Sequence, residues 1–309
     1  MLDSSAFCMN NERIGVVGLG LLGRGIAACF LAHGFRVVAL TKGGEEAYGA
    51  ARAYIANALT EYVAHTGADA GVAASWKDRY HEAAGFADFA DCAFVVESVT
   101  EDLAAKQDVF DGLEAVVGEE VPIASNTSAL PIGVLQKSRR NPRRFVGMHW
   151  AEPAHATRFL ELIRGEQTSD TAVERTAELG RRLDKDPCVV QKDVPGFIVN
   201  RLGYAMYREA VHLVEAGVAD VETVDKAFRN ACGLWASMCG PFRWMDITGG
   251  PALYARAMKG VLPTLDNSPE LPRTLREPPA SFYEYEAGEV ERWHEELHRN
   301  AWSLFKDKK

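Results

Sequence analysis

The chain has 309 residues, 47% hydrophobic and 25% charged, a composition typical of a soluble globular enzyme with one large or two smaller domains. Its net charge of −9 argues against nucleic acid or an anionic membrane as a partner, and no apolar stretch is long enough to span a membrane. The six cysteines show neither C-x-x-C nor zinc-ligand spacing, so we expect mostly buried, reduced thiols, no metal site and a cytoplasmic protein. The first residues, Met1 to Asn11, which include Cys8, lack the basic start and apolar core of a signal peptide.

A strand, a glycine-rich turn and a helix open the sequence. The apolar run Arg13–Val17 leads into Gly18-Leu19-Gly20-Leu21-Leu22-Gly23, and a helix of small residues is predicted over Leu21–Ala32. In such a G-x-G-x-x-G the first glycine permits a tight turn, the second lets the backbone approach a pyrophosphate, and the third lets helix and strand pack closely. Free N–H groups at the helix N-terminus attract phosphates. This context favours a dinucleotide site over a purely structural turn, with Gly18, Gly20, Leu21, Leu22 and Gly23 as its residues.

The second strand ends without the acidic residue that usually binds the adenosine ribose. After Arg36–Leu40 come Thr41 and Lys42, and no carboxylate appears before Glu45. A hydroxyl and a lysine suit a 2′-phosphate better than a bare ribose. We keep NAD as the expected cofactor, with NADP as the alternative, and Lys42 has a second interpretation as a solvated loop residue.

Short apolar strands and helices alternate through the rest of the first part. Further strands are predicted at Cys92–Val96, Val121–Ala124, Phe145–Met148, Phe159–Ile163 and Cys188–Gln191, and further helices at Glu45–His65, Leu103–Val117 and Thr171–Leu183. Continuous apolar strands between helices indicate a mostly parallel sheet covered on both faces. We predict an α/β fold whose N-terminal domain, residues 1–192, is a Rossmann-type doubly wound sheet.

Beyond residue 192 the pattern is helical. A long amphipathic helix is predicted from Phe197, another over Val221–Ala231 with Asp220 as its N-cap, and a third over Gly249–Gly260. Prolines indicate a loop over 261–280, and a last amphipathic helix runs from about Glu289 to Phe305. We assign residues 193–309 to a C-terminal all-helical domain.

His149 and Glu161 are the candidates for acid–base chemistry. His149 ends an apolar strand, and ligands of open α/β sheets bind beyond the carboxyl ends of the strands. Histidine titrates near neutral pH, as the base of an alcohol dehydrogenase must. Glu161 lies inside an apolar run, where a carboxylate needs a partner, and His149 is the natural one. Each residue alone has a structural interpretation, but the pair favours function.

Polar residues follow three further predicted elements. Asn126 and Ser128, in Ser125-Asn126-Thr127-Ser128, are placed to hold ligand oxygens, although Ser128 also suits a helix N-cap. Asn200 lies in the first turn of the long helix and is a candidate for facing a cleft. Glu97 ends a strand, whereas a solvated position is the default for Glu101 and Lys106.

These residues give the chain a resemblance to the 3-hydroxyacyl-CoA dehydrogenase family over nearly its whole length. The matching stretches are Gly18–Gly25, Glu97 through Glu101 to Lys106, Ser125–Ser128, Gly147–His149, Glu161, Asp193–Arg201, and Gly240-Pro241-Phe242 with Asp246. The resemblance implies that His149 is the catalytic base, that Glu161 is its partner, and that Ser128 and Asn200 position the substrate oxygen. It also implies a homodimer formed through the helical domain, and cofactor roles for Thr41, Lys42, Glu97, Glu101, Lys106 and Asn126.

The sequence departs from this family at the region expected to hold coenzyme A. Family members that bind CoA use lysines on a helical arm after the second strand, but Glu45 to Trp76 contains no lysine and only Arg52 as an arginine. Glu152-Pro153 also replaces the usual Asn-Pro after the histidine. An electronegative chain without a basic arm is a poor match for the phosphates of CoA. Relatives that act on free hydroxy acids, such as gulonate or carnitine dehydrogenases, share the same framework.

The resulting hypothesis is hydride transfer between NAD(P) and a 3-hydroxyacyl substrate, either a CoA thioester or a free hydroxy acid, which gives the 3-oxo form. Reductases of the 3-hydroxyisobutyrate and imine-reductase type are the second candidate, but the former use a lysine on the long helix, and none lies between Lys192 and Lys226. The third candidate is a non-catalytic dinucleotide-binding protein. His149 and Glu161 discriminate among the three.

Overall fold

The computed structural model describes residues 12–306. Our interpretation of Met1 to Asn11 as lacking a leader, and the expectation for Cys8, lie outside the described residues. No helix within the described range is both long enough and apolar enough to cross a membrane.

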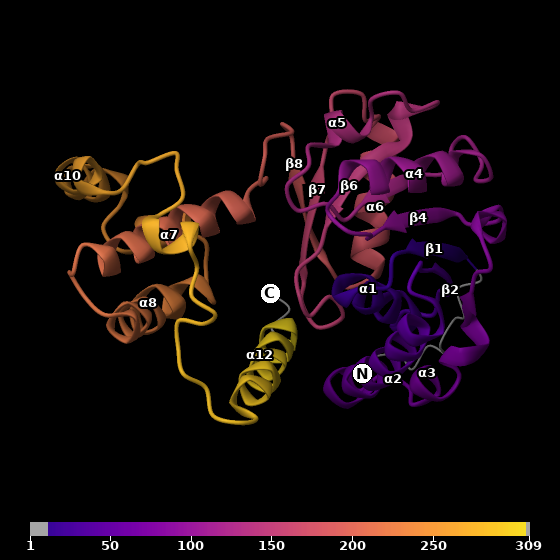
Figure 1. The fold of residues 1–309 in the computed structure, drawn as a ribbon, viewed down its shortest axis with the longest axis horizontal. Helices are drawn as coiled ribbons and strands as arrows, with labels where there is room; N and C mark the ends of the chain where they lie inside the picture. The colour runs from indigo at the N-terminus through magenta and orange to yellow at the C-terminus, as the bar shows by residue number, and fades with distance from the viewer. Residues whose placement is uncertain (1–11, 307–309) are drawn as a thin grey trace. The chain divides into compact units, whose positions relative to one another are not determined.

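Eight strands form one sheet in the order β3-β2-β1-β4-β5-β6-β7-β8 (Figure 1). The strands are β1 (Arg13–Val17), β2 (Arg36–Leu40), β3 (Tyr80–Glu82), β4 (Phe94–Glu97), β5 (Ile123–Ser125), β6 (Phe145–His149), β7 (Phe159–Ile163) and β8 (Asp186–Val190). All neighbours are parallel except β6 and β7. The predicted mostly parallel sheet is therefore confirmed, and the carboxyl ends of β1, β4, β5 and β6 meet at one edge, where ligands of such sheets bind.

Helices cover both faces of this sheet. Those of the first part are α1 (Leu21–Ala32), α2 (Gly44–Thr66), α3 (Gly71–Ala74), α4 (Leu103–Glu114), α5 (Ile132–Leu135) and α6 (Asp170–Arg182), with 3-10 turns at Trp76–Arg79, Phe86–Phe89 and Pro142–Arg144. One hydrophobic cluster packs α1, α2 and α6 against the sheet, and a second packs α4 and α5 against the opposite face. The sheet is thus buried between two cores, as its apolar strands require.

The second part of the chain is helical. It contains α7 (Val199–Glu215), α8 (Val221–Ala236), α9 (Pro241–Ile247), α10 (Pro251–Val261), a 3-10 turn at Leu262–Thr264, α11 (Arg273–Arg276) and α12 (Glu289–Lys306). The predicted N-cap is confirmed, since the Asp220 carboxylate accepts from the Thr223 N–H at 2.8 Å. Four short elements, β3, α3, α9 and α11, carry too weak a periodicity to be read from the sequence.

The compact units divide differently from the predicted domains. The first unit runs to Ile198 and takes up the chain again at His294, and the second comprises Val199–Trp293. The predicted boundary at residue 192 is therefore six residues early. The assignment of all of 193–309 to one helical domain also needs correction, because Trp302 and Phe305 of α12 belong to a core cluster of the sheet unit.

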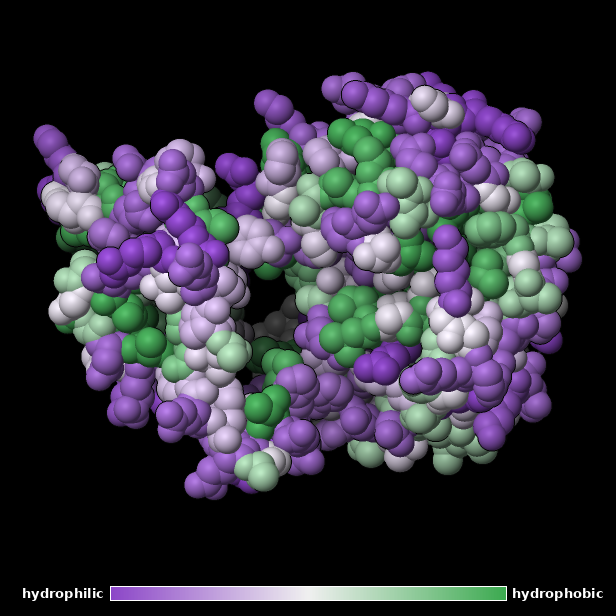
Figure 2. Space-filling model, viewed as in Figure 1, coloured by the Kyte–Doolittle hydropathy of each residue, from purple (hydrophilic) through white to green (hydrophobic). Residues whose placement is uncertain are grey.

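The second unit has little core of its own. Among the described residues, α7, α8, α9 and α10 contain no buried side chain. Large apolar side chains are exposed instead, including Leu234 at 72% and Phe242 at 79%, and hydrophobic patches appear as green in Figure 2. Isolated exposed apolar residues are ordinary, but here a whole set of amphipathic helices leaves its apolar residues without a buried face.

The expectation that most cysteines are buried is only partly correct. Cys29 and Cys92 are buried, Cys232 and Cys239 are partly exposed, and Cys188 is exposed. Cys188 lies on β8, the edge strand, whose alternating burial leaves one face open to solvent. An apolar run on an edge strand therefore does not imply burial on both faces.

Candidate active site

The glycine-rich turn connects β1 to α1 and is held by the backbone. Gly18 has φ +96°, a left-handed conformation that favours glycine, and its N–H donates to the Leu40 carbonyl at 2.8 Å. A Cβ on Gly23 would lie 1.9 Å from the Gly18 carbonyl oxygen. The first and third glycines are therefore demanded by the fold of the turn itself.

Gly20 is different, because no contact among the described residues 12–306 requires a glycine there. It is the N-cap of α1 with φ −65°, and an added Cβ would meet no heavy atom within 4 Å. No side chain in the described part of the chain caps α1, and the first turn of α1 carries no acidic residue. Open space before an uncapped helix N-terminus fits a pyrophosphate, which the N–H groups of this first turn, at Leu21 and Leu22, would hold.

The Thr41-Lys42 segment follows β2 beside this turn. Thr41 is half-buried, its N–H donates to the Tyr48 hydroxyl at 3.4 Å, and its own hydroxyl accepts from the Gly43 N–H at 3.3 Å. Lys42 is exposed. The carboxylate of Glu45 is engaged with Arg52, so it does not replace the missing acidic residue as a free acceptor.

Glu97 and Lys106 form a fully buried ion pair. The Lys106 Nζ lies 2.8 Å from Glu97 Oε1, and the other carboxylate oxygen accepts from the Ser125 hydroxyl at 2.6 Å. The expectation of a solvated Lys106 is therefore wrong: the lysine extends from α4 to the end of β4. This pair joins β4, β5 and α4 beneath the edge of the sheet where ligands bind.

Glu101 shapes the loop that carries Ser128. One of its carboxylate oxygens accepts from the Thr127 hydroxyl at 2.6 Å and from three successive N–H groups, those of residues 128, 129 and 130. Burial opposes ionisation of this carboxyl, but these hydrogen bonds and nearby Lys106 outweigh it and lower its pKa. Ser128 itself is exposed and does not cap α5, whose N-cap is Pro131, so the N-cap interpretation of Ser128 is wrong.

Asn126 connects two loops at the same edge of the sheet. Its Nδ2 donates to the Ser98 hydroxyl at 3.0 Å, and its Oδ1 accepts from the Trp150 N–H at 3.0 Å. Trp150 directly follows His149 at the end of β6. The Asn126 side chain thereby fixes the backbone next to the candidate base.

His149 and Glu161 are brought together by the antiparallel pairing of β6 and β7. They are cross-strand partners in the register, and the His149 Nδ1 lies 2.9 Å from Glu161 Oε2. Both residues are buried. Because an ionised carboxylate only accepts, the ring hydrogen belongs on Nδ1, which leaves Nε2 with the lone pair that a general base needs.

The segment after β8 completes the surroundings of this pair. Gly196 and Phe197 have φ +78° and +50°, and this left-handed turn places the buried Phe197 ring 5.7 Å from the His149 ring. The next N–H, that of Ile198, donates to the second oxygen of Glu161 at 3.0 Å. Phe159 flanks the imidazole at the same distance of 5.7 Å. Both Glu161 oxygens are therefore engaged, which fixes the carboxylate that orients the histidine.

Sequence reasoning identified the polar residues of the site but missed the aromatic ones. Phe159 and Phe197 looked like ordinary core residues, and only the positive φ of Phe197 marks it as special. Asn200 lies at the start of α7 in the second unit. Its role with Ser128 in binding a substrate oxygen stays a prediction.

The 3-hydroxyacyl-CoA dehydrogenase NAD binding domain matches residues 13–194, and the C-terminal domain of the same family matches residues 196–277. The 5-formyl-3-hydroxy-2-methylpyridine 4-carboxylate 5-dehydrogenase of Mesorhizobium japonicum is 35% identical over 90% of this chain and 89% of its own length.

Two solved structures extend the comparison. A crystal structure of a 5-dehydrogenase of that name, described as an NAD+ dependent dismutase, has a TM-score of 0.87 at 29% identity and covers 97% of this chain and all of its own. The (S)-3-hydroxybutyryl-CoA dehydrogenase of Ralstonia eutropha has a TM-score of 0.71 at 30% identity, covering 87% of this chain and 93% of its own. With both family domains matched in order, the chain belongs to the 3-hydroxyacyl-CoA dehydrogenase family and is an oxidoreductase with an NAD-binding domain.

Proposed function

We propose that the enzyme interconverts a hydroxyl and a carbonyl group on a small substrate without coenzyme A, with His149 as the catalytic base. The observation that carries this proposal is the buried His149–Glu161 pair, 2.9 Å apart at the carboxyl end of β6. The glycine turn ends β1 at the same edge of the sheet, because β1, β4, β5 and β6 are mutually parallel. Base and dinucleotide turn therefore face the same side.

The mechanism assigns each residue one task. The dinucleotide, which the glycine turn at Gly18, Gly20 and Gly23 would hold, would supply the hydride acceptor for the substrate carbon. His149 takes the hydroxyl proton on Nε2, and Glu161 stabilises the imidazolium through Nδ1–H. Ser128 holds the substrate oxygen as it becomes a carbonyl, and the family resemblance adds Asn200 to this role. In the reverse direction the imidazolium returns the proton.

The electrostatics of α2 support a substrate without CoA. Arg52 is the only lysine or arginine between Glu45 and Trp76, and its guanidinium is already paired with Glu45 and with Glu82, the latter at 2.7 Å. No free cation is thus left on this helix for the phosphates of CoA. The greater structural similarity to a pyridine-carboxylate dehydrogenase than to a hydroxybutyryl-CoA dehydrogenase favours the same class of substrate.

Steady-state kinetics test the reaction and the substrate class together. The panel includes 3-hydroxybutyryl-CoA, free 3-hydroxybutyrate, carnitine, gulonate and 5-formyl-3-hydroxy-2-methylpyridine 4-carboxylate, each with NAD or NADH. We expect turnover of a CoA-free compound that the His149→Ala variant loses by about 10²–10⁴-fold, while NAD binds normally. Near-normal turnover in the variant contradicts the assignment, and NAD binding without any turnover supports a non-catalytic protein.

The choice between NAD and NADP rests on Lys42. NAD is the expected cofactor, and an exposed lysine next to Thr41 is the feature that favours NADP as the alternative. We expect Lys42→Ala to lower kcat/KM for NADP while that for NAD stays within about twofold. An unchanged ratio shows that Lys42 is only a solvated loop residue.

The exposed apolar helices of the second unit support a homodimer. Burying side chains such as Leu234 and Phe242 contributes roughly 1.5–3 kcal/mol each. We expect light scattering after gel filtration to give twice the chain mass of 33.9 kDa, and Phe242→Asp to weaken this association. A wild-type monomer at micromolar concentration contradicts the proposal.

A further inference from the structure

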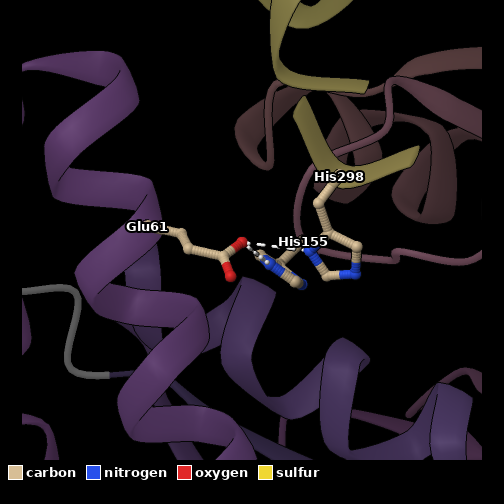
Figure 3. Close-up of side chains that lie close together, drawn as sticks. All are labelled: Glu61, His155 and His298. Carbon is tan, nitrogen blue, oxygen red and sulfur yellow. Dashed lines mark hydrogen bonds and ion pairs between the residues drawn. The ribbon is translucent and has the colours of Figure 1, made fainter. Parts of the chain in front are cut away.

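A cluster of three metal-ligating side chains lies outside the candidate active site. Glu61 of α2, His155 of the loop between β6 and β7, and His298 of α12 present donor atoms that all lie within 4.8 Å of one another. Figure 3 shows the Glu61 carboxylate pointing at both imidazoles. We propose that these residues form a divalent transition-metal site, with zinc as its best-fitting ion, that clamps the C-terminal helix onto the sheet unit.

The donor set and spacing fit zinc. Glu61 Oε2 lies 3.2 Å from His155 Nε2 and 3.1 Å from His298 Nδ1. A tetrahedral ion with bonds of about 2.0–2.1 Å separates its donors by about 3.3 Å. Two of the three distances between donor atoms therefore nearly equal this value before any ion binds. Two imidazoles with one carboxylate are also a typical protein ligand set for zinc.

Hydrogen bonds from His155 through Tyr54 to Glu152 hold the His155 ring in the orientation that a metal ligand needs. His155 is buried, and its other ring nitrogen, Nδ1, lies 3.4 Å from the Tyr54 hydroxyl. That hydroxyl donates to Glu152 Oε1 at 3.1 Å. Metal-binding histidines almost always use the second ring nitrogen in this way, because it fixes the tautomer and raises ligand basicity. With hydrogen on Nδ1, Nε2 points its lone pair at the proposed ion.

A pocket beside the three ligands gives solvent access to the proposed ion and leaves room for a fourth ligand. A surface pocket of about 320 Å³ is lined by Glu61, His298 and Trp302 together with His65, His294, Glu295 and Arg299. Water can occupy the remaining tetrahedral position from this pocket. Trp302 is buried, and its Nε1 also donates to Glu61 Oε2, at 3.3 Å, which aims the carboxylate.

The ligands come from three segments far apart in the chain, so an ion here would crosslink them. Glu61 and His298 are 237 positions apart, and α12 packs on the sheet unit through Trp302 and Phe305. An ion that binds only the folded arrangement stabilises it by mass action. The site would therefore act on the attachment of α12 and not on hydride transfer.

Zinc titration of the full-length protein tests the proposal. After treatment with EDTA and dialysis, zinc is titrated against a chromophoric chelator at pH 7.5, and bound metal is measured by mass spectrometry. We expect one zinc per chain, and a loss of affinity of at least 100-fold in Glu61→Gln and in His298→Gln. Tyr54→Phe should lose about tenfold. The matched control is His81→Gln, a surface histidine with 57% side-chain exposure outside the cluster, which should bind normally.

Two further measurements test whether zinc binds at this cluster and not at a cysteine. The variants retain every cysteine, and the spectrum of the cobalt-substituted protein should lack a thiolate charge-transfer band. Zinc at 100-fold excess over Kd should raise the wild-type Tm by about 5–10 °C and leave His298→Gln unchanged. Circular dichroism checks that each variant folds, and Glu61→Gln replaces the more exposed of the two ligands, with 37% side-chain exposure against 24% for His298. The absence of bound zinc at 10 µM free metal, or equal binding by the variants, overturns the proposal and leaves a hydrogen-bonded cluster.

Discussion

Of the two glycines at the start of α1, only Gly23 should lose stability on substitution by alanine, whereas both should lose NAD affinity. Gly20 has φ −65° and open space where a Cβ would stand, whereas a Cβ on Gly23 would lie 1.9 Å from a backbone oxygen. Alanine at position 20 therefore fits the free protein, and alanine at position 23 does not. If a pyrophosphate lies against Gly20, the added methyl group meets the ligand only.

The magnitudes follow from these contacts. At position 20, alanine is a poorer helix N-cap than glycine, which lowers the free energy of unfolding by roughly 0.3–1 kcal/mol. Alanine also restricts the unfolded chain, which raises the free energy of unfolding by about 0.4–1 kcal/mol, so the net change is small. At Gly23, the overlap forces a backbone shift that costs about 1–3 kcal/mol or more. For a unit of this size that lowers Tm by roughly 2–12 °C. NAD affinity should fall at least tenfold in Gly20→Ala, equal to about 1.4 kcal/mol.

Differential scanning fluorimetry without cofactor gives Tm, and isothermal titration calorimetry gives the Kd for NAD. We expect Gly20→Ala to keep the wild-type Tm within about 2 °C and to lose NAD affinity. Gly23→Ala should lose both. Wild-type NAD affinity in Gly20→Ala refutes the placement of the pyrophosphate at this glycine, and a wild-type Tm in Gly23→Ala refutes the close approach within the turn.

Three other residues give independent tests. Glu161→Gln should lower kcat by about 10–100-fold and alter the pH profile of kcat, because the Glu161 side chain orients His149. The Kd for NAD should not change, and an unaltered pH profile would contradict the orienting role of Glu161. Lys106→Met should destabilise the protein by about 3–5 kcal/mol in urea unfolding, since it leaves the Glu97 carboxylate buried and unpaired, and the double variant Glu97→Gln/Lys106→Met should recover much of this loss. In EDTA, the free energy of unfolding of the wild type should exceed that of His298→Gln most below pH 6.5, and this difference should decline as pH rises. The reason is that the hydrogen bond to Glu61 raises the pKa of His298 above 6.5 in the folded protein. A difference in unfolding free energy that stays constant from pH 6 to pH 9 contradicts this prediction. The titratable and charged groups around His298 are the same in the wild type and in His298→Gln, so their own titration is common to both proteins. These groups are His65, Glu152, His155, His294, Glu295 and Arg299.

The pairing of His149 with Glu161 was predictable because burial of a carboxylate demands a partner. Each residue sits in its own apolar run, and apolar strands of one sheet offer few polar groups to each other. What the sequence does not contain is the direction of β7. Antiparallel pairing with β6 makes the two residues direct neighbours, and a parallel arrangement would have put Glu161 elsewhere.

Lys106 shows where local spacing fails. Its separation from Glu101 does not match a helical pair, so a solvated side chain was the natural expectation. The lysine instead extends along α4 to Glu97, nine positions earlier and on a strand. Such a pairing depends on how the helix packs against the sheet, which side-chain periodicity does not encode. The same limit applies to α12, whose amphipathic pattern predicts a helix but not the unit that it joins.

The turn between β8 and α7 connects the family motif with the chemistry. The glycine of Asp193-Val194-Pro195-Gly196-Phe197 is readily explained by its positive φ, but Phe197 adopts a positive φ as well, which costs a bulky residue about 1 kcal/mol or more. Two contacts offset that cost: the ring packs against His149, and the following N–H holds Glu161. The strain is therefore located where it orders both members of the catalytic pair.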